Sequence, residues 1–140
     1  MLLMDARFSS ILLVEDDESD RDLFLWAIKE IQPGLNCRWA KDGQEALDIL
    51  SSAKSNLPDC IYMDYNMPRM DGLECMKHIK EDPSLNHIPV VFLSTSSDLG
   101  VQKKVKAAGA AAYITKPFTL KSFVEVLTFY LVPANIAQLG

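Results

Sequence analysis

Five short apolar runs alternate with five amphipathic segments along this chain, and that alternation restricts the possible folds more than any other feature. The apolar runs, which we expect to be strands, are residues 10–16, 36–40, 60–64, 88–94 and 111–115. The amphipathic segments repeat apolar residues at helical spacing and are residues 19–31, 42–52, 72–82, 98–109 and 119–131. Ser19 or Asp20 can cap the first of these segments, and Trp26 within it is expected to lie in the core or partly in it. Nearly continuous apolar strands are typical of a parallel sheet that helices cover on both faces. The sequence therefore predicts a doubly wound α/β fold with right-handed crossovers.

The bulk properties fit one domain over residues 1–140, with a core over 9–131 and a tail over 132–140 that has no strong pattern. The net charge of −5 and the lack of a basic face argue against direct binding of nucleic acid. Three widely spaced cysteines argue against a disulfide framework or a zinc site, and suit a reducing cytosol. Neither a signal peptide nor an apolar run of the ~18 residues that a membrane span needs is present. We therefore expect a cytoplasmic protein without a membrane segment.

Polar side chains end four of the five expected strands. Glu15 and Asp16 end the first strand, Asp64 the third and Ser94 the fourth, and Lys116 follows the fifth. Because the strands of a parallel sheet run the same way, their carboxyl ends meet at one edge, where sites gather in such folds. The sequence therefore predicts that these five side chains lie together.

Such a group of side chains indicates a metal ion and a phosphoryl group. Carboxylates that share one edge repel each other, and a divalent cation offsets that repulsion. Oxygen ligands without a nearby cysteine or histidine favour Mg²⁺ or Mn²⁺ over zinc. An ammonium group and a hydroxyl, from Lys116 and Ser94, suit the oxygens of a phosphoryl group. Each residue alone could equally cap a helix or a loop, or face solvent, so the hypothesis depends on finding all of them in this order.

Four stretches that carry these residues resemble a known family. They read ILLVEDDESD, YMDYNMPRMDG, IPVVFLSTSS and AAYITKPF, and they resemble the CheY-like receiver domain of two-component response regulators over residues 9–131. The resemblance implies a flavodoxin-like fold of five strands, in the order 2-1-3-4-5, and five helices. The stretch HIKEDPSLNHIPVVFLSTSS is similar to single-domain receivers of the cyanobacterial phytochrome type.

The resemblance implies a role for each residue of the predicted site. Asp64 corresponds to the phosphoacceptor, and Lys116 and Ser94 to the lysine and hydroxyl that act with it. Asp16 corresponds to a direct ligand of Mg²⁺ and Glu15 to a ligand through water, with Asp64 as a third ligand.

Three further positions match the family's pattern. Asn66 corresponds to the residue whose backbone carbonyl binds the metal. Tyr113 corresponds to the aromatic switch that turns inward together with Ser94 on activation, although packing alone would also explain an aromatic residue at a strand end. Pro117 corresponds to a proline that follows a cis peptide bond.

The resemblance implies a stand-alone receiver of a two-component phosphorelay. Its expected partner is a sensor histidine kinase of the phytochrome or hybrid type, and it is expected to be a phosphoacceptor rather than a turnover enzyme. No output domain follows residue 131, so output is expected through binding, either to a downstream phosphotransfer protein or, as a homodimer, to a second copy through Phe129 and Tyr130.

Two other classes of protein compete with this interpretation. A phosphohydrolase of the haloacid dehalogenase type needs a second acid two residues after the nucleophile, where this chain has Asn66. A receiver-like interaction module that is never phosphorylated stays open as the alternative.

Overall fold

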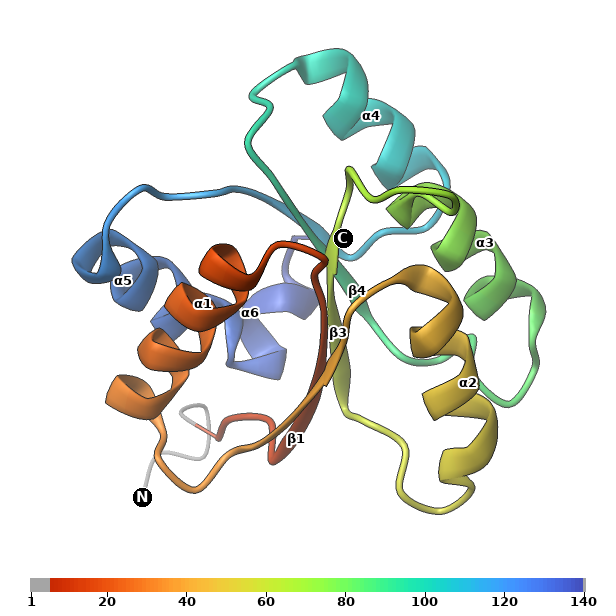
Figure 1. Cartoon of the computed structure of the whole chain (residues 1–140), viewed down its shortest axis with the longest axis horizontal. Coiled ribbons are helices and arrows are strands. Elements are labelled where there is room, and N and C mark those ends of the chain that lie inside the picture. The colour runs from red at the N-terminus through yellow and green to blue at the C-terminus, as the bar shows by residue number, and fades with distance from the viewer. Residues whose placement is uncertain (1–5, 140) are drawn as a thin grey trace.

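The computed structural model describes residues 6–139, so residues 1–5 and 140 of the expected domain lie outside the described part. The element order is strictly alternating as far as α5, and one further helix follows (Figure 1). Within residues 6–139, none of the helices has both the length and the apolar character that crossing a membrane requires.

The sheet has five parallel strands in the order β2-β1-β3-β4-β5, which confirms the predicted fold and strand order. The strands are β1 (Ser10–Val14), β2 (Asn36–Ala40), β3 (Cys60–Asp64), β4 (Val90–Ser94) and β5 (Ala112–Thr115). Asp64 pairs with Leu93 in the register of β3 and β4, and Ser94 pairs with Thr115 in that of β4 and β5. Ser94 therefore lies one register position beyond Asp64, and Lys116 one position beyond Ser94, so the polar residues of neighbouring strands end within one residue of each other.

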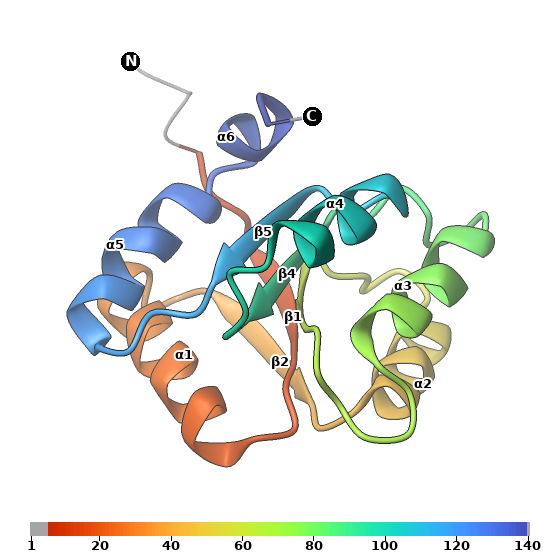
Figure 2. The same cartoon turned by 90° about the horizontal axis from the view of Figure 1, so that it is seen from above.

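Helices cover both faces of the sheet, as Figures 1 and 2 show. One apolar core lies under α2 (Gly43–Ala53), α3 (Gly72–Glu81) and α4 (Leu99–Ala107). The second lies under α1 (Glu18–Ile31), α5 (Leu120–Tyr130) and the short α6 (Pro133–Ala137). Strands β1, β3 and β4 contribute alternate residues to the two cores, which explains why their sequences are apolar without a break.

Three details differ from the expectations. The tail contains α6, which starts at a proline and buries Ile136, but five residues are too few to show a helical period. The cap of α1 is Asp17, whose carboxylate accepts from the Asp20 amide, whereas Ser19 or Asp20 was expected to cap it. Trp26 was expected to lie in the core or partly in it, but it is 63% exposed on the surface of α1.

Candidate functional site

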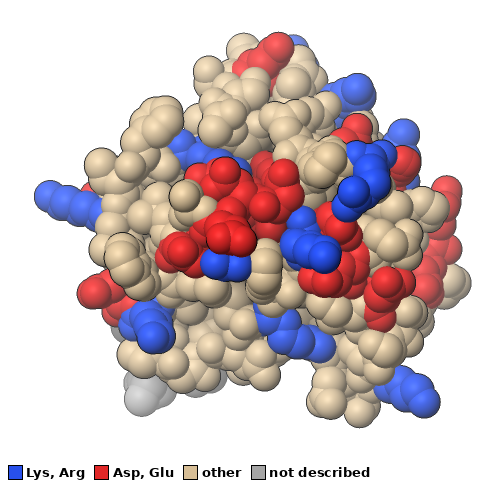
Figure 3. Space-filling view, viewed as in Figure 1, with Lys and Arg blue, Asp and Glu red and all other residues tan. Residues whose placement is uncertain are grey.

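The carboxyl edge of the sheet brings together all five polar side chains that end the strands. Glu15 and Asp16 follow β1, Asp64 and Ser94 are the last residues of β3 and β4, and Lys116 follows β5. All except Asp16 are buried. Figure 3 shows acidic side chains gathered in the middle of this face, with basic side chains beside them.

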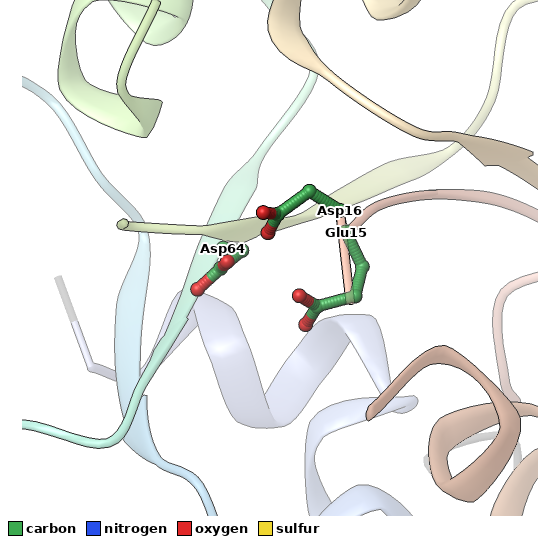
Figure 4. Close-up of side chains that lie close together, drawn as sticks. All are labelled: Glu15, Asp16 and Asp64. Atoms are coloured by element: carbon green, nitrogen blue, oxygen red, sulfur yellow. The ribbon is translucent and has the colours of Figure 1, made fainter. Parts of the chain in front are cut away.

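Three carboxylates converge at this edge. Figure 4 shows the carboxyl groups of Glu15 and Asp16 turned toward Asp64, and one oxygen of each lies within 4.8 Å of the other two. An octahedral Mg²⁺ ion holds its ligands at ~2.0–2.1 Å, so ligands on opposite sides of it are ~4.2 Å apart. The oxygen-only donor set therefore fits Mg²⁺ or Mn²⁺.

The ammonium group of Lys116 lies beside these carboxylates. Its Nζ donates to Glu15 Oε1 at 2.8 Å and to Asp20 Oδ2 at 2.9 Å. The same nitrogen forms an ion pair with Asp64 Oδ1 at the longer distance of 3.4 Å. One ammonium group thus offsets part of the charge of three carboxylates, of which Glu15 and Asp64 have little access to water.

Burial and mutual repulsion shape the protonation of the site. Burial and, after it, the charge of Glu15 raise the pKa of Asp64 to about 8, against the opposing charge of Lys116. Burial also raises the pKa of Glu15, against the opposing effect of its hydrogen bond with Lys116. Burial acts to lower the pKa of Lys116, but the surrounding carboxylates outweigh it, and the net pKa is raised. A further cation next to these carboxylates would therefore stabilise their ionised forms.

The segment after β3 holds Asp64 in place through a close approach of α3. The Gly72 amide donates to the Tyr65 carbonyl at 3.0 Å, so the loop closes directly onto the end of the strand. A Cβ atom at position 72 would lie 2.4 Å from the backbone oxygen of Asp64, which is closer than real Cβ contacts allow. Only glycine permits this approach, so Gly72 helps to set the position of Asp64.

A chain of hydrogen bonds joins Ser94 to Tyr113. The Ser96 amide donates to Ser94 Oγ at 3.1 Å, and the Tyr113 hydroxyl donates to the Ser96 carbonyl at 2.5 Å. Ser94 is fully buried and Tyr113 is half-buried against the core under α4. The two expected switch residues are thus linked through the backbone of Ser96.

Comparison with known proteins agrees with this geometry. Residues 11–128 match the family model of the response regulator receiver domain, which is most of the chain. The chain belongs to the response regulator receiver family. It is therefore a CheY-like receiver domain of two-component signalling, as its motifs indicated.

Individual receivers are similar over nearly their whole length. The polar-differentiation response regulator DivK of Brucella anthropi is 35% identical over 122 residues, which are 87% of this chain and 95% of DivK. The phosphorylated cyanobacterial phytochrome response regulator RcpA is 31% identical with a TM-score of 0.81, over 90% of this chain and 95% of RcpA. The Mn²⁺-bound response regulator Rcp1 is 28% identical with a TM-score of 0.78, over 89% and 96% of the two chains.

Of two further expected features of the receiver site, one is wrong in the structure and the other stays a prediction. The peptide bond between Lys116 and Pro117 is trans, as are all peptide bonds in residues 6–139, so the expected cis bond before Pro117 is wrong here. The trans isomer is the more stable one for most bonds before proline, by ~0.5–1 kcal/mol. Asn66 is exposed two residues beyond the end of β3, and the role of its carbonyl as a metal ligand stays a prediction.

Sequence reasoning missed Asp20 as a member of this receiver site. It considered Asp20 only as a helix cap, whereas the carboxylate lies against Lys116. The usable signal was the position of Asp20 in the first turn of a helix that starts directly after Glu15 and Asp16. An acid in that turn can reach back to the edge of the sheet.

Proposed function

We propose that this receiver accepts a phosphoryl group from a sensor histidine kinase onto Asp64, with Mg²⁺ or Mn²⁺ as the metal ion. The observation that carries the proposal is that the Asp64 carboxylate lies between two other carboxylates and an ammonium group. It converges with Glu15 and Asp16, and its Oδ1 lies 3.4 Å from Lys116 Nζ. A nucleophilic carboxylate between a set of metal ligands and an ammonium group is suited to phosphoryl transfer.

In the proposed step, an oxygen of ionised Asp64 attacks the phosphorus of a phosphohistidine in line with the leaving nitrogen. The bond between phosphorus and nitrogen breaks as the new bond between phosphorus and oxygen forms, and the imidazole keeps the electron pair. Lys116 pairs with one phosphoryl oxygen, and the Ser94 hydroxyl donates to another. When bound, the metal ion supplies charge neutralisation at the transferring group.

The proposed role is that of a phosphoacceptor rather than a turnover enzyme. Water attacks the phosphorus of the acyl phosphate at the same site, which breaks its bond to Asp64, releases inorganic phosphate and restores the carboxylate. No small-molecule substrate is required.

The hydrogen bonds from Tyr113 through Ser96 to Ser94 support a route for the signal. A phosphoryl group that draws in the Ser94 hydroxyl also displaces the Ser96 backbone, and with it the partner of Tyr113. The face built by α4, β5 and α5 then has two arrangements whose populations depend on phosphorylation. We propose that this face binds a downstream phosphotransfer protein or a second copy of the chain.

The similarity to RcpA and Rcp1 supports two finer parts of the proposal. RcpA is described as a phosphorylated phytochrome response regulator and Rcp1 as bound to Mn²⁺. We propose by analogy a kinase of the phytochrome or hybrid type, and a divalent ion on Glu15, Asp16 and Asp64.

Labelling with acetyl phosphate and Mg²⁺ tests the proposed function directly. We expect one phosphoryl group per chain by intact-mass spectrometry, removed by base and by hydroxylamine as an acyl phosphate is, and none after chelation of the metal with EDTA. Asp64→Asn should remove the labelling, whereas Asp22→Asn, on the exposed side of α1, should leave it unchanged. Labelling of the Asp64→Asn chain, or in EDTA, contradicts the proposal. A folded wild-type chain that takes up no phosphate from acetyl phosphate or from a kinase is instead an interaction module.

A further inference from the structure

Lys116 has more acidic partners than phosphoryl transfer on Asp64 requires. Two hydrogen bonds from its Nζ, to Glu15 at 2.8 Å and to Asp20 at 2.9 Å, are both shorter than its 3.4 Å distance to Asp64. Since a strong charge-assisted hydrogen bond is ~2.7–2.9 Å long, the nucleophile is the weakest of the three partners. The ammonium group is thus held to one side of Asp64.

The start of α1 explains why Asp20 is available for this contact. Asp17 is the cap and Asp20 is the third helical residue, a position from which an acidic side chain often reaches back to the amide of the cap. Here Glu15 Oε2 already accepts from the Asp17 amide, at 3.3 Å. The Asp20 amide is fixed by Asp17 Oδ1 at 2.9 Å, and its carboxylate is free to turn toward Lys116.

The two short contacts of Lys116 differ in how easily they open. The side chain of Glu15 is 2% exposed, so separating it from Lys116 would leave a buried charge without a partner. The side chain of Asp20 is 41% exposed, so water can take the place of Lys116 around its carboxylate. A new anionic partner for Lys116 would therefore displace Asp20 rather than Glu15.

We propose that Asp20 is a positioning residue that holds Lys116 toward α1 until a phosphoryl group on Asp64 takes its place. This inference rests on the proposed role of Asp64 as phosphoacceptor. The resting site keeps Lys116 ionised and oriented but not fully engaged with Asp64. When the phosphoryl group binds Lys116, Asp20 is released to solvent, and the first turn of α1 loses its tie to β5.

Binding of beryllofluoride, an analogue of the phosphoryl group, tests the role of Asp20 at saturating Mg²⁺. Asp20→Ala removes the competing acceptor, and we expect it to tighten binding by about two- to fivefold, the range typical of one partly exposed ion pair. Asp20→Glu keeps an acceptor at this position and should restore the wild-type affinity. Glu18→Ala, which removes an exposed acid from the same turn of the helix, should leave the affinity unchanged. Fluorine NMR measures all four dissociation constants.

A metal-free measurement provides a second readout that a merely structural role of Asp20 would not change. In a crystal structure of the Asp20→Ala chain grown without metal above pH 8, where Asp64 is ionised, the distance from Lys116 Nζ to Asp64 Oδ1 should fall from 3.4 Å to about 2.8 Å. An unchanged distance, or an affinity for beryllofluoride that is unchanged or weaker, overturns the role of Asp20. If the wild-type chain itself binds no beryllofluoride, the proposed function fails first, and the inference fails with it.

Discussion

Replacing Asp64 by asparagine should stabilise the metal-free chain, although Asp64 is buried in the middle of the site. Burial, with the charge of Glu15, raises the pKa of Asp64 from 3.8 to about 8. A tenfold change in a protonation equilibrium is worth ~1.4 kcal/mol, so the shift lowers the free energy of unfolding at pH 7 by on the order of 4 kcal/mol. Asparagine is neutral in both the folded and the unfolded state, so this loss of stability is absent in the variant. We expect Asp64→Asn to raise the free energy of unfolding by about 2–4 kcal/mol at pH 7.

The dependence on pH follows from the same shift. Between about pH 4 and pH 8 the folded chain keeps the proton of Asp64, whereas the unfolded chain has lost it. The contribution of Asp64 to the free energy of unfolding of the wild-type chain therefore becomes more unfavourable as the pH rises through that window. The advantage of Asp64→Asn should be small near pH 4, grow with pH, and level off above about pH 8.

Urea denaturation in EDTA, followed by circular dichroism across this pH range, measures the effect. Glu30→Gln is the matched control, because Glu30 is an exposed acid on α1 away from the site and its replacement should change the free energy of unfolding by less than ~0.5 kcal/mol. With Mg²⁺ at about a hundred times its dissociation constant, the wild-type chain and the control should each gain ~2.7 kcal/mol, and Asp64→Asn should lose most of that gain. An Asp64→Asn chain that is less stable than wild type in EDTA at pH 7 would refute the reasoning.

Three further predictions concern the surroundings of the site. Gly72→Ala should destabilise the chain by ~1–3 kcal/mol, because its Cβ would meet the Asp64 carbonyl, while Gly34→Ala, with nothing within 4 Å, is the control in the same denaturation assay; equal effects would contradict the close approach. Arg69 has a φ of 65°, so Arg69→Gly should be more stable than Arg69→Ala by ~1 kcal/mol, and the reverse order of melting temperatures would count against backbone strain. Burial raises the pKa of all three cysteines to about 12, so a thiol reagent near neutral pH should modify them only after unfolding, and rapid modification of the native chain would show that the thiols are accessible.

The fold was largely predictable because each of the five strands and each helix from α1 to α5 has a local signal. The central strand at residues 60–64 has the predicted bounds, since an apolar run that ends in an acid marks both its burial and its end. The first strand was expected to continue to Asp16 but ends at Val14. The end of a strand is difficult to predict when acids follow it closely. An apolar run shows which residues are buried, but it does not show where backbone pairing with the neighbouring strands stops.

The membership of the site was predictable only as far as the ends of the strands. Glu15, Asp64 and Lys116 meet because parallel strands bring their carboxyl ends together, which follows from the fold alone. Asp20 reaches the site from a helix, and its partner depends on the rotamer that remains once Asp17 and Glu15 have satisfied the helix start. The spacing of residues in the sequence does not determine this rotamer. The exposure of Trp26 was missed for a similar reason, because an amphipathic period alone does not show which positions the neighbouring helices cover.

A crystal structure of the chain with Mg²⁺ and beryllofluoride would test the central claim most directly. The account predicts one metal ion on the oxygens of Glu15, Asp16 and Asp64, with beryllofluoride on Asp64 and both Lys116 Nζ and Ser94 Oγ within hydrogen-bonding distance of its fluorines. Clear density for the ion or for beryllofluoride at another place, with these side chains unchanged, would contradict it.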